Sequence, residues 1–205
     1  MKYNTLANQK SIDITTAALR AKGIETYVVR TKAEALEQIK HIIPPGASVM
    51  NGASVTLEQI GFVDYLKLGT HGWNNLHKPV NAETDPAKRA ILRKQAALSD
   101  FYLGSVHALV ENGEFIVASN TGSQLPHIAF TSPNLIFVVG THKIVPTLTE
   151  GIKRLEEYVV PLEDAHMKKL HGTGTHLNKI LISKGESPFL KRRIHFILIQ
   201  ESLGF

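Results

Sequence analysis

Three segments of the sequence end a predicted strand in glycine and hydroxyl-bearing residues, a pattern that suits the binding of an anion. The runs are NGASVTLEQIG after residues 47–50, NTGSQLP after residues 115–119 and GTHKIVP after residues 135–139. Glycine lets the backbone approach a ligand, hydroxyl groups bond to its oxygens, and helix N-termini favour negative charge. Each run alone is more consistent with an ordinary turn or cap. Together, at the carboxyl ends of strands in one sheet, they predict a ligand site.

Two charged side chains in or next to these runs could act on a ligand. Lys143 follows the strand at 135–139 and could meet a phosphate or carboxylate, or it is a solvated loop lysine. Glu58 could be a general base or nucleophile, or an acid that complements the dipole of the helix beginning after Ser54. Asp100 precedes a strand and could simply cap or end the helix before it.

The histidines do not form a metal-binding pattern. His71 and His77 bracket the loop HGWNNLH, and His171 and His176 lie in the glycine-rich stretch HGTGTH. Neither pair has the spacing of an HExxH motif, so we predict no metal site. The chain also lacks cysteine, which excludes a thiolate zinc site and a cysteine-bound iron–sulfur cluster. No GxGxxG after a strand, Walker A or GxSxG motif supports a dinucleotide, nucleoside triphosphate or serine hydrolase site.

The elements that must position these residues alternate between helix and strand. The predicted strands cover residues 24–30, 47–50, 105–111, 114–119, 134–140 and 195–200. The predicted helices cover residues 4–21, 32–42, 85–97, 126–130 and 148–159, with a long loop at 69–86. Asn112-Gly113 predicts a type I′ hairpin turn, which needs positive φ at both positions. We therefore expect an α/β fold, with a mostly parallel central sheet flanked by helices and an inserted β-hairpin.

Composition is consistent with one globular domain. The chain has 205 residues, of which 43% are apolar and 20% charged. The net charge of +5 is spread along the chain; the cluster Lys191 to Arg193 suits a solvated turn better than a nucleic-acid patch. No apolar run reaches the ~20 residues needed to cross a bilayer, and the start lacks a signal peptide. We therefore expect a cytoplasmic protein without nucleic-acid or membrane partners.

The run SDFYLGSVHALVENGEFIVASNTGSQLPHIAFTSPNLIFVVGTHKIVPTLTEGIKRLEEYVVP resembles the core of the LUD domain, and the upstream GASVTLEQIGF resembles the first loop motif of that family. The resemblance covers roughly residues 45–165 and implies a single LUD domain over residues 1–205, with an N-terminal helical segment at 1–45. The fold of this family is similar to that of the group of ribose-phosphate isomerases, sugar-phosphate deaminases and CoA transferases, whose ligands lie at the strand ends.

Family resemblance implies a role in lactate utilization, the oxidation of L-lactate to pyruvate alongside iron–sulfur partner proteins. Carried onto this chain, it implies a site for a small anionic metabolite formed by Gly52, Ser54, Thr56, Asn120, Thr121, Gly122, Ser123 and Lys143. Because the chain has no cysteine, it would bind no cluster directly and would act as a partner or binding subunit. The stretch at 170–185 departs from the family pattern, so the resemblance does not decide the contacts with partner proteins. A homo-oligomer is also compatible with the sequence.

Two other functions remain open at this stage. One is a stand-alone isomerase or transferase that acts on a sugar phosphate or CoA thioester, with Glu58 or Asp100 as acid–base groups. The other is a sensor or scaffold that keeps the crevice without chemistry. A fold alone does not choose between them.

Overall fold

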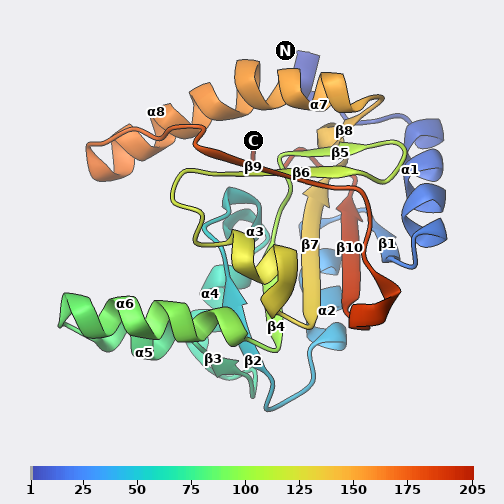
Figure 1. The fold of residues 1–205 in the computed structure, drawn as a ribbon. Helices are drawn as coiled ribbons and strands as arrows, with labels where there is room; N and C mark the ends of the chain where they lie inside the picture. Colours follow the sequence, from blue (N-terminus) through green and yellow to red (C-terminus); the bar gives the residue numbers. More distant parts are fainter. Residues whose placement is uncertain (1) are drawn as a thin grey trace.

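The computed structural model describes residues 2–205, and its centre is a sheet of six parallel strands (Figure 1). The strand order is β1-β10-β7-β4-β2-β3, and every neighbouring pair is parallel. The strands are β1 (Glu25–Val29), β2 (Ser48–Asn51), β3 (Asn74–Asn75), β4 (Phe101–Gly104), β7 (Asn134–Gly140) and β10 (Arg193–Ile199). The expected α/β class with a parallel central sheet is confirmed.

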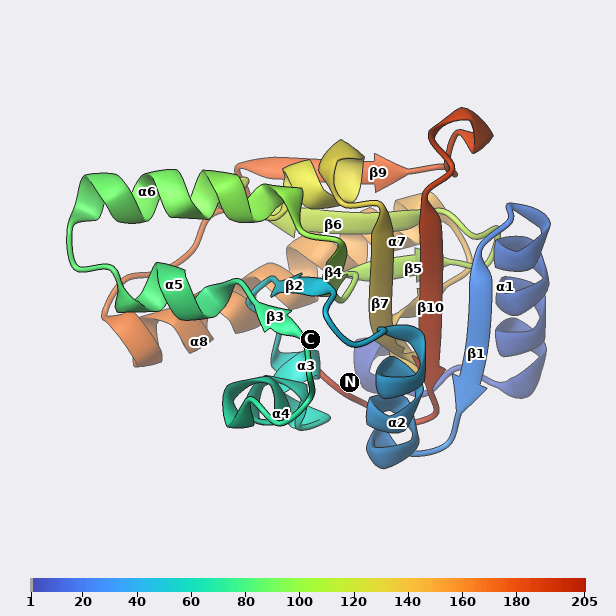
Figure 2. The same ribbon diagram turned by 90° about the horizontal axis from the view of Figure 1, so that it is seen from below.

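Eight α-helices connect and cover the strands among residues 2–205. They are α1 (Gln9–Ala21), α2 (Lys32–Ile42), α3 (Val55–Gln59), α4 (Phe62–Leu68), α5 (His77–Ala82), α6 (Pro86–Gln95), α7 (Leu148–Arg154) and α8 (Val160–His171). Side-chain caps begin several of them: Asn8 accepts from the N–H of Ser11, and Thr31 from that of Glu34. Seen from below, α1 lies beside β1 at one end of the sheet, and α5 and α6 project side by side from the other (Figure 2).

Both faces of the central sheet are buried, because successive side chains of its inner strands enter two different cores. On β7, Ile136 and Val138 belong to the core that also contains residues of α2, α3 and α4. Leu135 and Phe137 point to the opposite face and belong to a core shared with α1 and a second sheet. This arrangement explains why β7 is apolar from Leu135 to Val139 rather than alternating between apolar and polar residues.

The second sheet has four strands in the order β8-β5-β6-β9. These are β5 (Ala108–Val110), β6 (Phe115–Ser119), β8 (Ile144–Val145) and β9 (Lys179–Ser183). The pair β5–β6 is the expected antiparallel hairpin, and β9 adds antiparallel to β6. A third core lies between this sheet and the region of α7, so the sheet is packed on both sides.

The hairpin region differs from the expectation in two ways. The predicted strand at 105–111 was wrong at its start: β4 ends at Gly104 in the central sheet, and β5 begins at Ala108 in the second. The turn is not type I′, because Gly113 has a φ of 81° while Asn112 does not have a positive φ. The N–H of Val110 donates to Glu114 O at 2.7 Å, which closes a three-residue loop with glycine in the left-handed position.

Three further segments differ from the sequence-based prediction. The predicted loop at 69–86 contains strand β3 and helix α5. The helix predicted to end at residue 159 continues through a π-helical turn (Leu155–Val159) into α8. Strand β9 was not predicted. Only one of its faces packs against the protein, so its sequence lacks the strongly apolar pattern of a buried strand.

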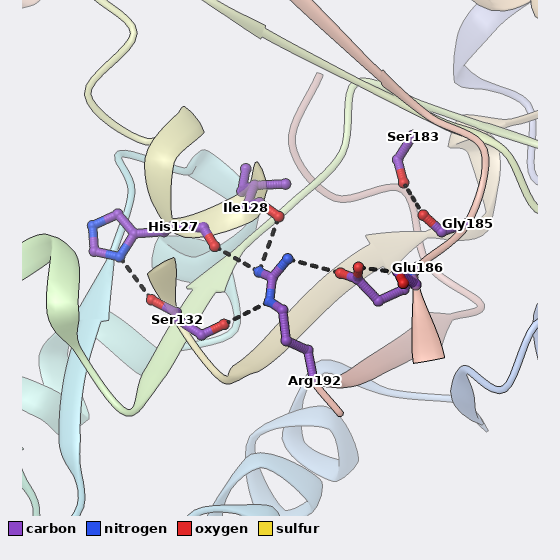
Figure 3. A network of polar contacts seen from close by, with 8 residues as sticks. His127, Ile128, Ser132, Ser183, Gly185, Glu186 and Arg192 are labelled. Atoms are coloured by element: carbon purple, nitrogen blue, oxygen red, sulfur yellow. Dashed lines mark hydrogen bonds and ion pairs between the residues drawn. The ribbon is translucent and has the colours of Figure 1, made fainter. Parts of the chain in front are cut away.

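In the basic cluster at 191–193, Lys191 and Arg193 are exposed as expected of a solvated turn, whereas the side chain of Arg192 is buried in a network of polar contacts (Figure 3). Its guanidinium donates to the carbonyl oxygens of Ser132 at 3.0 Å and His127 at 2.8 Å, and pairs with Glu186 at 2.7 Å. These bonds tie the segment before β10 to the π-helical turn at His127–Thr131. Among residues 2–205, no helix combines the length and apolar character needed to span a membrane.

Candidate functional site

Three neighbouring strands of the central sheet bring the site together at their carboxyl ends. Strands β2, β4 and β7 are adjacent and parallel, so their ends share one edge. The chain delivers Thr56 on α3 after β2, Ser105 directly after β4, and Lys143 in the short turn after β7. The side chains of these three residues meet, as expected for a site beyond the ends of parallel strands.

Lys143 is the charged residue at the centre of this contact. Its side chain is buried, with 3% of the residue exposed, and Nζ donates to Thr56 Oγ1 at 3.1 Å and to Ser105 Oγ at 3.2 Å. Among residues 2–205, no carboxylate forms an ion pair with it. Burial, followed by the nearby charge of Arg154, lowers the pKa of Lys143 to about 7. The ammonium form is thus poorly compensated, and an anion would stabilise it.

Arg154, at the end of α7, is a second buried cation behind this site. It is fully buried, and its Nη1 donates to the carbonyl oxygen of His107. Its Nε and Nη2 form no hydrogen bond with any of residues 2–205, and its guanidinium lies 5.3 Å from the ring centre of Tyr158. Burial lowers the pKa of Arg154 to about 10. Two buried cations that pair with no carboxylate of the described residues give this region a positive potential.

His107 is held neutral beside the two cations. Its Nδ1 accepts a hydrogen bond from the backbone N–H of Ala118 at 3.0 Å, which leaves the ring proton on Nε2. Burial, together with the charges of Lys143 and Arg154, lowers the pKa of His107 to about 3. A neutral imidazole can donate to a ligand oxygen without adding charge.

A cavity of about 390 Å³ opens in front of these residues. Its polar wall comes from the turns after β2, β4, β6 and β7: Gly52, Ser54, Thr56, Ser105, His107, Asn120, Thr121, Ser123 and Lys143. Its other wall comes from the region of α8 and from the last residues of the chain: Leu155, Val159, Val160, Glu163, His166, Met167, Leu177, Gly204 and Phe205. Figure 1 shows the end of the chain between α8 and α3, where it contributes to this wall.

Seven of the eight predicted binding residues line this one cavity. The exception is Gly122, whose N–H donates to Ser119 Oγ at 2.9 Å within the turn after β6. That turn reaches the cavity although β6 belongs to the second sheet, so the expectation of one shared sheet was wrong for it. Whether the seven residues bind a ligand stays a prediction.

Two backbone positions in the wall leave no room for a side chain. A Cβ on Gly52 would lie 2.3 Å from the hydroxyl oxygen of Tyr102. Gly204 has a φ of 70°, and a Cβ there would lie 2.3 Å from Thr56 Oγ1 and 3.0 Å from Lys143 Nζ. Glycine at 204 therefore lets the backbone pass directly against the lysine site.

The carboxylates divide between the cavity and the opposite end of the sheet. Glu58 lines the cavity together with Glu163 of α8. Burial raises the pKa of Glu163, and the charge of Glu58 raises it further, while His166 opposes the shift. Asp100 does not belong to the site, because its carboxylate accepts from the N–H and hydroxyl of Ser48 at the start of β2. This overturns its predicted acid–base role.

The histidines noted in the sequence serve different purposes. His71 accepts from the N–H of Trp73 at 2.9 Å, and His77 Nε2 lies 3.0 Å from the carbonyl oxygen of Asn51, so both organise the segment before α5. His171 and His176 line the outer cavity. Within residues 2–205, no group of three or more histidine, aspartate and glutamate side chains is arranged to hold a metal ion.

Sequence reasoning missed Ser105, Glu163 and the tail at 203–205. Ser105 was assigned to a strand, although it begins the connection between two sheets. The tail is fixed by local bonds: Thr56 Oγ1 donates to the carbonyl oxygen of Leu203 at 3.2 Å, and the N–H of Gly204 donates to Gln59 Oε1 at 2.7 Å. The motif Leu-Gly-Phe is the only sequence signal at this point, and it is weak.

Comparison with known proteins agrees with this architecture. A solved structure described as a DUF162 family protein from Deinococcus radiodurans has the same α/β fold, with a TM-score of 0.59 and 14% sequence identity. The alignment covers 95% of this chain and 99% of that one. No curated protein matches the sequence. The family model of the LUD domain matches residues 12–187, and the chain belongs to this family. The tail that closes the cavity lies outside the matched residues.

Proposed function

We propose that this protein binds a small anionic metabolite in the cavity at Lys143 and takes part in lactate utilization. The observation that carries the proposal is the buried ammonium group of Lys143, which contacts two hydroxyls and, within residues 2–205, no carboxylate. An anion placed there would gain charge-assisted hydrogen bonds, which are stronger than neutral ones. The link to lactate comes from the LUD family, whose members are associated with lactate utilization.

Within lactate utilization, we assign this chain the part of a binding subunit. The chain has no cysteine, whereas electron transfer from lactate in this family is tied to iron–sulfur proteins. A cluster would therefore be carried by a partner, and this chain would present the acid or its oxidised product. L-lactate and pyruvate both offer a carboxylate for Lys143 and a neighbouring oxygen for Thr56, Ser105 or the neutral His107.

Binding is tested by thermal unfolding and calorimetry with L-lactate, pyruvate, inorganic phosphate, ribose 5-phosphate and CoA. Ligand at about 100 times its dissociation constant stabilises the native protein by about 2.7 kcal/mol. We expect stabilisation by carboxylates in the wild type and its loss in Lys143→Met. The matched control is Lys153→Met, which removes an exposed lysine on α7 and should bind as the wild type does. Equal binding to Lys143→Met and the wild type would contradict the proposal.

A second candidate function is a stand-alone isomerase or transferase that acts on a sugar phosphate or CoA thioester. Two observations favour it: the cavity lies in the size range used for ligands larger than a three-carbon acid, and its wall contains the carboxyl groups of Glu58 and Glu163. Because burial raises the pKa of Glu163, that residue suits a general acid, and Glu58 is the second carboxylate available in the wall. Stabilisation by ribose 5-phosphate or CoA alone would favour this function over lactate utilization.

The partner assignment needs its own experiment. Purification of the tagged protein from its native cell should recover a cysteine-rich iron–sulfur protein if this chain is a binding subunit. Turnover of a sugar phosphate by the isolated chain, abolished in Glu58→Gln and Glu163→Gln, would instead establish the second candidate.

A further inference from the structure

Lys143 combines three features that make a lysine nitrogen a nucleophile. It is shielded from water, the charge of Arg154 acts on it, and it lines the cavity together with Thr56 and Ser105, to which its Nζ donates. A lysine that is desolvated, or placed next to a second cation, keeps a larger share of its amine in the neutral form. The pKa of about 7 at Lys143 is consistent with this environment, since both forms are then populated at neutral pH.

We propose that Lys143 forms an imine with the carbonyl group of a 2-oxo acid bound in the cavity. This inference rests on the proposed anion site, because the carboxylate brings the neighbouring carbonyl carbon to Nζ. A 2-oxo acid is the class that offers an anion and an electrophilic carbon on adjacent atoms. The protonated imine keeps the positive charge of the lysine, so the charge pair with the carboxylate survives bond formation.

The step is balanced without an oxidant or a reductant. The neutral Nζ attacks the carbonyl carbon, a carbon–nitrogen bond forms, and the electron pair of the carbonyl π bond moves to oxygen, which takes up a proton. The nitrogen then loses a proton, and the hydroxyl group leaves as water after protonation. One neutral amine, one ketone and one proton thus become one protonated imine and one water.

Two hydroxyls are placed to carry the protons of this step. Thr56 Oγ1 lies 3.1 Å and Ser105 Oγ lies 3.2 Å from Nζ, and the two oxygens are 3.4 Å apart. A hydroxyl accepts and donates, so each can take a proton from the nitrogen and return one to the departing oxygen. Neither hydroxyl is charged, so neither would hold the lysine in its ammonium form as a carboxylate would.

The test is reductive trapping of the full-length protein with pyruvate and sodium borohydride. We expect the protein mass to rise by one pyruvate less one water plus two hydrogens. Peptide mapping should place the adduct on Lys143 and show that trypsin no longer cleaves after it. L-lactate is the matched ligand control, because it carries the same carboxylate without a carbonyl and should give no adduct. The adduct should be lost in Lys143→Met and kept in Lys153→Met.

The outcomes separate this inference from the proposed function. Pyruvate binding by calorimetry without an adduct overturns the imine and leaves the anion site standing. Absence of both binding and adduct overturns both. An adduct spread over exposed lysines overturns the imine at Lys143 as well. Because the wild-type map identifies the modified residue directly, the test holds even if Lys143→Met does not fold.

Discussion

Replacing Lys143 by methionine should change how the stability of the protein depends on pH. In the wild type the ammonium group is buried, no carboxylate in the described part of the chain pairs with it, and burial lowers its pKa from 10.5 to about 7. Below about pH 7 the lysine carries its proton in both the folded and the unfolded chain, and the folded state bears the full desolvation cost. Above that pH the folded chain releases the proton while the unfolded chain keeps it. The unfolded state then binds more protons, so stability rises with pH.

The magnitude follows from the size of the pKa shift. One unit corresponds to about 1.4 kcal/mol, so a lowering from 10.5 to about 7 amounts to about 5 kcal/mol over the whole range. Between about pH 7 and pH 9 the wild type should gain about 2 kcal/mol relative to Lys143→Met. The difference in the free energy of unfolding between the two proteins isolates the effect of Lys143, because the contributions of titrating groups that the substitution does not affect cancel.

Urea unfolding of both proteins at a series of pH values measures this difference. We expect Lys143→Met to be favoured most at low pH and its advantage to shrink as the pH rises towards 9. Parallel stability curves across this range would refute the reasoning, because they would mean that Lys143 titrates alike in the folded and unfolded chains.

Three further predictions concern binding and stability. The affinity for a carboxylate should be constant below about pH 7 and then fall by up to about tenfold per pH unit, because Lys143 of the unliganded protein loses its proton above that pH. Calorimetry that gives the same affinity from pH 6 to pH 9 would disprove this prediction. Gly204→Ala should weaken carboxylate binding by roughly tenfold, because the added Cβ crowds Lys143. The control is Gly172→Ala, since Gly172 also has a positive φ but a Cβ there meets open space. Equal affinities in the two variants would refute the crowding. Arg192→Met should lower the free energy of unfolding by about 2–4 kcal/mol, because it removes the donor to three buried carbonyl oxygens. The control Arg193→Met, at an exposed position, should lower it by under about 0.5 kcal/mol. Equal urea midpoints for these two variants would contradict the structural role of Arg192.

Strong local patterns explain which elements the sequence predicts well. Helix α2 begins and ends at the residues that its apolar spacing predicts, and β7 matches its uninterrupted apolar run. Both patterns come from residues close together in the chain. The same applies to Ser54, whose Oγ accepts from the N–H of Leu57 at 3.3 Å as predicted for an N-cap.

Elements defined by long-range contacts were harder to predict. Strand β3 has two residues and exists because it pairs with β2. Helix α8 was missed because Pro161 usually marks a helix end, yet here it directly follows the π-helical turn Leu155–Val159 and the helix continues past it. The sequence likewise does not show that β6 joins a second sheet, since that depends on pairing with β9 more than sixty residues later.

The candidate site shows the same division. Gly52, Thr56 and Lys143 could be predicted because each follows a recognisable strand. Ser105 and Glu163 could not be predicted. Ser105 lies between two strands whose sequences form one continuous apolar segment, and Glu163 lies on a helix that was not predicted. Lys143 is buried because the ends of three strands and the C-terminal tail meet around it. No local sequence pattern predicts such a long-range contact.

The most direct test of the anion site is the pKa of Lys143 itself, measured by carbon-13 NMR at Cε in the free protein and with bound L-lactate. Lys143→Met identifies the resonance. We predict a pKa of about 7 in the free protein and a clear rise when the carboxylate binds. A pKa near 10.5 that does not respond to the ligand would contradict the account.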